Sequence, residues 1–79
     1  MTKAKKLTGT PSEGDVERMV AEFGEQSVIC YLLISGWDIQ RRAELVREDL
    51  KGQWLFTAAW YFAQAKILEE RLRGGPGGG

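Results

Sequence analysis

The chain has 79 residues, 11 basic and 11 acidic side chains that cancel at neutral pH, one cysteine and no histidine. A chain of this size buries only about 60% of the surface that its unfolded form exposes, so we expect association with a partner to add to its stability. The single cysteine excludes an intrachain disulfide, and the lack of histidine excludes a zinc site of the usual Cys/His kind. The balanced charge gives no overall field that would attract nucleic acid.

Both ends of the chain have the composition of tails around a single domain. Residues 1–9 form a basic arm that we expect to be flexible, and residues 74–79 are a flexible glycine-rich tail, so the expected helical domain spans residues 10–73. The start of the chain lacks the apolar stretch of a secretory signal, and the apolar run at residues 28–34 is far shorter than the roughly 20 residues that span a bilayer. We expect a cytoplasmic protein with no transmembrane segment.

A helix is predicted to begin within the sequence TPSE, residues 10–13. Thr10 would be the N-cap and Pro11 the first helical residue, while Glu13 would complete a capping box with Thr10. Gly24 is expected to bend or end this helix. The apolar residues between recur at i, i+3, i+4 and i+7, as on one helix face: Val16, Met19, Val20 and Phe23.

Residues 27–34 are apolar on every side and contain several β-branched residues. This pattern permits either a helix or a buried strand. A helix is favoured because the chain has no second strand candidate, and a lone strand would leave its backbone groups unpaired unless a second subunit supplied one. A helix that is apolar all round is expected to be central and covered.

The sequence SGWD, residues 35–38, predicts a turn and a new helix start. Gly36 can adopt a positive φ, and Ser35 and Asp38 have the spacing of a second capping box. An amphipathic helix is expected to follow. Its apolar face would hold Ile39, Ala43, Val46 and Leu50, and its outer face would hold two opposite-charge pairs at i, i+3, Glu44 with Arg47 and Glu48 with Lys51.

Gly52 is predicted to break this helix, and residues 53–73 are predicted to form the last one. Lys66, Arg71 and Arg73 would lie near its negative end, with Glu69 and Arg73 as an i, i+4 pair, and Gly74 would stop it. The predicted fold is therefore all-α, with three helices arranged as a helical hairpin plus one further helix, and we expect it to dimerise.

Catalysis has little support in the sequence. Without histidine, the Ser/His/Asp and Cys/His arrangements cannot form, and Cys30 lies in an apolar segment where we expect a buried structural thiol. The carboxylates of Glu13, Asp15 and Glu17 lie near a helix start, where they complement the helix dipole. We expect a protein that is not an enzyme and that has no cofactor and no metal site.

Nucleic-acid binding is the alternative function that the sequence leaves open. A phosphate-binding surface could combine the basic arm with the outer face of the amphipathic helix that follows residues 35–38. Glu44, Glu48 and Asp49 would cancel much of the positive potential of that surface. The possible contacts are Lys3, Lys5, Lys6, Arg41, Arg42 and Arg47.

Aromatic side chains are concentrated at residues 54–62 and give the main functional hint. On a helix they cover a wider arc than two neighbouring helices need, and large apolar patches are uncommon on monomers. We expect a regulatory or interaction protein that forms a homodimer or binds another protein, with Trp60 as the buried anchor and Tyr61 nearer the rim. The expected interface consists of Trp54, Phe56, Trp60, Tyr61, Phe62 and Ile67.

Overall fold

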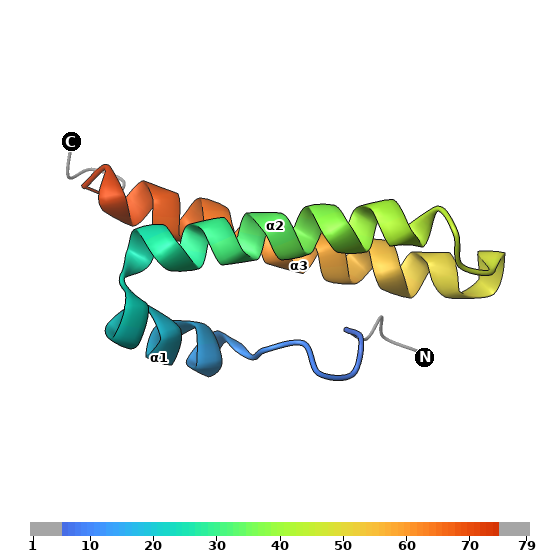
Figure 1. Cartoon of the computed structure of the whole chain (residues 1–79), viewed down its shortest axis with the longest axis horizontal. Helices are drawn as coiled ribbons and strands as arrows, with labels where there is room; N and C mark the ends of the chain where they lie inside the picture. Colours follow the sequence, from blue (N-terminus) through green and yellow to red (C-terminus); the bar gives the residue numbers. More distant parts are fainter. Residues whose placement is uncertain (1–5, 75–79) are drawn as a thin grey trace.

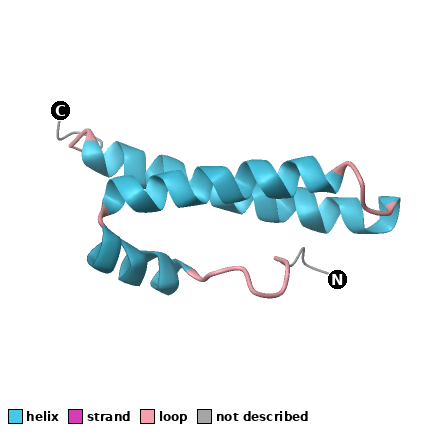
Figure 2. Ribbon diagram, in the orientation of Figure 1, coloured by secondary structure: helices cyan, strands magenta, loops and turns pink. Residues whose placement is uncertain are grey.

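A computed structural model describes residues 6–74 and contains three α-helices. They are α1 (Glu13–Phe23), α2 (Glu25–Ala43) and α3 (Glu48–Leu72), and residues 6–74 include no strand. The long helices α2 and α3 form an antiparallel hairpin, and α1 packs along one side of it (Figures 1 and 2). The all-α, three-helix prediction is confirmed, and residues 27–34 are helical.

The first helix begins two residues later than the sequence predicted. Its N-cap is Ser12 and not Thr10, because Ser12 and Asp15 make the reciprocal bonds of a capping box. The Ser12 backbone N–H donates to Asp15 Oδ2 at 2.9 Å, and the Asp15 backbone N–H donates to Ser12 Oγ at 3.2 Å. Gly24 then separates α1 from α2 with a φ of 89°, which favours glycine.

The predicted breaks at Gly36 and Gly52 are wrong, because both glycines lie inside helices. At Gly36 the missing side chain serves helix packing, since a Cβ there would lie 2.9 Å from a ring carbon of Phe62. Asp38 does not cap a helix and instead forms an ion pair with Arg42 at 3.0 Å. The chain turns at residues 44–47, after which Glu48 and Asp49 occupy the positive N-terminal end of α3.

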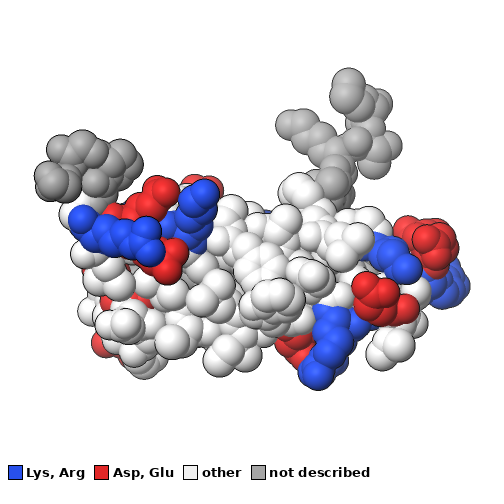
Figure 3. All heavy atoms as spheres, turned by 90° about the horizontal axis from the view of Figure 1, so that it is seen from above, with Lys and Arg blue, Asp and Glu red and all other residues white. Residues whose placement is uncertain are grey.

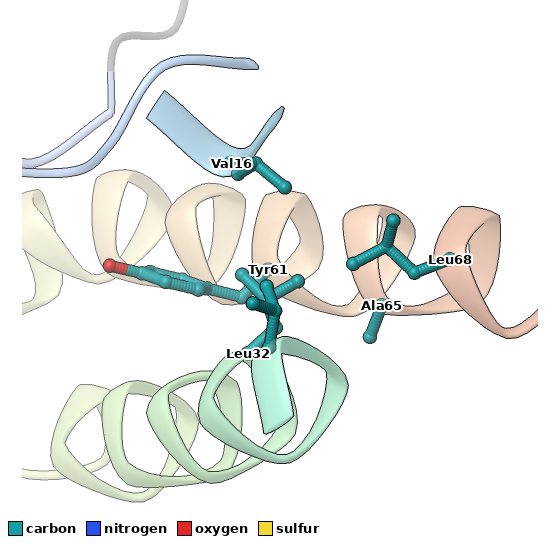
Figure 4. Close-up of a cluster of buried hydrophobic side chains, with 6 residues drawn as sticks. Val16, Leu32, Tyr61, Ala65 and Leu68 are labelled. Carbon is teal, nitrogen blue, oxygen red and sulfur yellow. The ribbon is translucent and has the colours of Figure 1, made fainter. Parts of the chain in front are cut away.

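The hydrophobic core joins one residue of α1 to the facing sides of α2 and α3. In Figure 4, Val16 and Leu32 converge on α3, and Leu32 is fully buried. Burying a side chain of this size contributes roughly 1.5–3 kcal/mol. The buried cluster comprises Val16, Val28, Leu32, Tyr61, Ala65 and Leu68, with Met19, Val20, Ile29, Ile39 and Trp60 packed against it.

Several apolar residues expected in the interior are exposed. Phe23, at the last position of α1, is 60% exposed, because the chain turns away at Gly24. The segment 28–34 is not covered on all sides as predicted. Val28 and Leu32 are buried, whereas Tyr31, Leu33 and Ile34 are exposed, since α1 and α3 together cover only part of α2.

The charged side chains pair mainly on the surface. The predicted pair Glu48 with Lys51 is present at 3.9 Å, and Glu69 with Arg73 is present at 4.0 Å. Arg47 pairs with Asp49 at 2.7 Å, and not with Glu44, because Glu44 and Arg47 lie in the turn. One longer-range pair, Arg71 with Glu17 at 2.7 Å, ties the end of α3 to α1. Within residues 6–74, every helix is too short or too polar to cross a membrane.

Candidate interaction surface

The side of the hairpin opposite α1 carries an uncovered apolar surface, here called the open face. It consists of Leu33 and Trp37 on α2 and Leu55, Ala59 and Phe62 on α3. Trp37 is 62% exposed and Leu55 is 43% exposed. Seen from that side, the Lys, Arg, Asp and Glu side chains leave a broad uncharged area between the two ends of the molecule (Figure 3).

Helical spacing places these residues together. Leu33 and Trp37 are four apart on α2, while Leu55, Ala59 and Phe62 follow at i, i+4 and i+7 on α3. The rings of Trp37 and Phe62 meet edge to face, with centroids 5.4 Å apart and planes at 70°. This aromatic contact, which depends on the absence of a side chain at Gly36, joins the two helices across the open face.

The opposite side of α3 is covered by an extended segment, residues 6–12, here called the strap. The Leu7 backbone N–H donates to Thr57 Oγ1 at 3.0 Å, and the Thr57 hydroxyl donates to the Gln53 carbonyl at 2.9 Å. The Lys6 ammonium lies 4.0 Å from the centroid of the Trp60 ring, a cation–π contact. Part of the arm expected to be a tail is thus in contact with α3.

The six aromatic and apolar residues predicted as an interface do not form one surface. Phe62 lies on the open face, whereas Phe56 and Ile67, at 42% and 45% exposed, lie on the flank of α3 next to Trp60. Trp54 and Trp60 are half-buried. Tyr61 is only 6% exposed, within the core of the single chain, so the expected order of Trp60 and Tyr61 is reversed.

Leu33 and Trp37 of the open face are not among the interface residues that the sequence predicts. The sequence does contain a signal for an apolar surface on this helix, because residues 28–34 are apolar on more sides than one neighbouring helix can cover. The predicted turn at residues 35–38 places Leu33 and Trp37 in different helices. They share a face only if the helix continues through Gly36.

The basic residues proposed for nucleic acid are largely engaged within the chain. Arg41 and Arg42 both pair with Asp38, at 3.4 and 3.0 Å, and Arg47 pairs with Asp49. Lys6 lies over Trp60 on the strap. Lys3 and Lys5 lie outside the described residues. A phosphate-binding surface is therefore not assembled from Arg41, Arg42 and Arg47 without breaking these pairs.

The thiol of Cys30 is exposed, which corrects the expectation of a buried structural cysteine. Cys30 points away from α3 because it lies two residues from buried Val28 and two from buried Leu32, on the other side of the helix. Among residues 6–74, no cluster of three or more His, Cys, Asp or Glu side chains has an arrangement that could hold a metal ion. An open furrow on α2 is lined by Ile34, Ser35, Trp37, Asp38, Gln40, Arg41 and Glu44.

Three titratable groups report on the packing. Burial, and then the neighbouring Tyr31, raise the pKa of Tyr61 to about 12. The pKa of Asp15 is lowered, first by the hydrogen bond from the Ser12 backbone, and the pKa of Glu17 is lowered by its hydrogen bond from Arg71. All three shifts arise from contacts that hold α1 and the core, and none lies on the open face.

Comparison with protein-family models, curated protein sequences and solved structures finds no match to this chain. The open face and its chemistry are therefore the features of this chain that indicate a function.

Proposed function

We propose that this protein is a non-catalytic interaction protein, acting in the cytoplasm, that binds a protein partner, either a second copy or another protein, through the open face. The observation that carries the proposal is the unequal covering of the hairpin. One side is packed against α1 and the strap, whereas the other exposes Trp37 and Leu55 around a half-buried Phe62. Tryptophan and phenylalanine are enriched at the centres of protein interfaces, and charged residues are depleted there.

The chemistry of the open face fits a protein surface better than a small molecule or a nucleic acid. The furrow that includes Trp37 is lined by α2 and the residue after it, so it has no second wall to enclose a ligand. The uncharged middle of the face offers no cation to a phosphate group (Figure 3). A second apolar helical surface can cover it by side-chain packing alone.

A site-specific photo-crosslinker at Leu55 tests this proposal in cells that produce the protein. We expect one adduct of discrete mass, and we expect Trp37→Glu in the same chain to abolish it, because a carboxylate would be desolvated in the apolar contact. The control places the crosslinker at Leu45, which is 85% exposed in the turn between α2 and α3. Equal adducts from both positions, or an adduct unaffected by Trp37→Glu, would contradict the proposal.

A further inference from the structure

A stripe of seven residues of α3 and its C-cap, Arg73, runs through the open face and is here called the α3 stripe. Successive members are three or four residues apart, and at 100° per residue they fall within an arc of about 80°. Phe62 belongs to it and packs on Gly36 and Trp37 of α2. In chain order, the members are Glu48, Lys51, Leu55, Ala59, Phe62, Lys66, Glu69 and Arg73.

The charges of the α3 stripe complement those of the same stripe turned end for end. Reversal places Glu48 opposite Arg73 and Lys51 opposite Glu69, so that each acid meets a base. In the middle it places small Ala59 opposite large Phe62, as interdigitating helices require. Leu55 comes opposite Lys66, whose aliphatic stem can cover it.

We infer that the partner of the open face is a second copy of this chain. The two copies are related by a two-fold axis that passes over the surface of α3 between Ala59 and Phe62. This inference rests on the proposed function and names its partner. The axis lies in the interface and is perpendicular to the helices, so α3 packs antiparallel on α3 of the second copy. An isologous interface of this kind requires a self-complementary surface, which the α3 stripe provides.

The contacts of Phe62 with α2 show where the two-fold axis passes α2. Because Phe62 contacts Gly36 and meets the ring of Trp37, the axis passes α2 close to Trp37, and the Trp37 side chains of the two copies come near each other. Trp37 is 62% exposed in the single chain, and a side chain of its size can bury roughly 150–250 Å². The most exposed aromatic residue of the open face thus lies at the centre of the dimer.

The side of the hairpin that carries the open face at its centre is large enough for a stable dimer. Its length follows the 19-residue α2, which is about 28 Å long, and two helices about 10 Å apart give a width of about 20 Å. The projected area is roughly 550 Å². The accessible area is larger because side chains make the surface uneven, and it approaches the ~800 Å² that one partner contributes to a standard interface.

The charged residues at the two ends of the α3 stripe determine the register of the dimer more than its affinity. Glu48 and Arg73 have side chains 91% and 76% exposed, and each belongs to a long intrahelical pair at 3.9 or 4.0 Å. Exposed pairs of this kind contribute little to stability but choose partner and orientation in helical assemblies. In the dimer, the two intrahelical pairs come together as one group of four alternating charges at each end.

Charge reversal in two matched variants tests the register. The first variant is Glu48→Lys with Lys51→Glu, and the second is Glu69→Lys with Arg73→Glu, so each keeps its intrahelical pair and its net charge. Alone, each variant places like charges opposite each other, and we expect its dissociation constant to rise about tenfold at low salt. Mixed together, the two variants should form a heterodimer with wild-type affinity, because all four pairs are again opposite in sign.

Analytical ultracentrifugation with one variant carrying a mass tag measures these associations. Recovery in the mixture also shows that both variants fold, and the tenfold difference should vanish near 1 M salt, where the Debye length is about 3 Å. The control variant, Asp38→Arg with Arg42→Asp, reverses an ion pair of α2 that lies off the α3 stripe and should associate as the wild type does.

Three outcomes overturn the inference, and each is distinct from failure of the proposed function. A wild type that stays monomeric at high concentration excludes the second copy, whereas an adduct from Leu55 with a different protein would still support binding at the open face. A dimer that Trp37→Glu disrupts but the charge reversals leave unchanged uses the open face in another register. A dimer that neither change affects uses a different surface, and the crosslinker at Leu55 then decides separately whether the open face binds another protein.

Discussion

The two broad sides of the α2–α3 hairpin carry similar apolar side chains but differ in what covers them. On the covered side, Val16 of α1 fills the space above Leu32, Tyr61 and Leu68, and each of these residues is at most 6% exposed. On the open face, Leu33 and Trp37 have the same helical spacing as the core residues Val28 and Leu32 but lack a third helix. Residue type alone therefore does not separate buried core from exposed surface in a chain this small, and the position of the third helix does.

Leu32 and Leu33 give the largest expected contrast between the two sides. Leu32→Ala should cost about 2–5 kcal/mol of unfolding free energy at every protein concentration, because Leu32 is fully buried within one chain. Leu33→Ala should have a cost that shrinks on dilution, since the second copy that we propose to cover Leu33 dissociates. Urea unfolding at two protein concentrations measures both. Equal and concentration-independent costs would remove the distinction between the two sides.

Gly36 connects the core to the open face and gives the next largest effect. Gly36→Ala should destabilise the protein by about 1–3 kcal/mol, because the new Cβ would lie 2.9 Å from the Phe62 ring and would force it away from Trp37. Gly52 is the matched control, since it also lies inside a helix, but a Cβ added there would have no neighbouring atom within 4 Å. Gly52→Ala should stabilise α3 by about 0.5–1 kcal/mol. Thermal unfolding should therefore shift in opposite directions for the two variants.

Tyr61 allows the covered side to be probed by pH. Its folded pKa of about 12 lies above the ordinary value of 10.0, so the unfolded chain loses the phenolic proton first as pH rises. The stabilisation is fully present below pH 10 and is lost between about pH 10 and 12, by about 1–3 kcal/mol. Tyr61→Phe should flatten this part of the stability profile. An unchanged slope in Tyr61→Phe would show that other groups cause the loss.

Ser12 gives the smallest expected effect and concerns the helix that covers the core. Ser12→Ala should destabilise the protein by about 1 kcal/mol, because it removes the oxygen that accepts from the Asp15 backbone N–H. Thr10→Ala should have little effect on helix capping, although the sequence predicts Thr10 as the cap. Chemical denaturation of the two variants compares them directly. A larger cost at Thr10 would return the helix start to the predicted position.

Sequence reasoning located the helices where periodic apolar residues and caps agree, as at Val16, Met19 and Val20 of α1 and at Gly24 after it. It failed at Gly36, because glycine in a sequence is usually taken as a turn signal. Here glycine is needed for close contact with Phe62, which is 26 residues away in sequence. The same failure hid the open face, since it divided α2 between Leu33 and Trp37. The real turn at residues 44–47 contains no glycine or proline that could have marked it.

The hydrogen bond between Leu7 and Thr57 spans 50 residues of sequence. The hairpin can form from contacts between neighbours across the short turn at residues 44–47, but this bond requires the start of the described chain to return to the middle of α3. Closing such a long loop has an entropic cost, which lowers the stability of this contact relative to the local contacts of the hairpin. The exchange rate of the Leu7 amide proton with deuterium therefore measures how readily the strap opens from α3, and it can be measured separately from the amides of the hairpin.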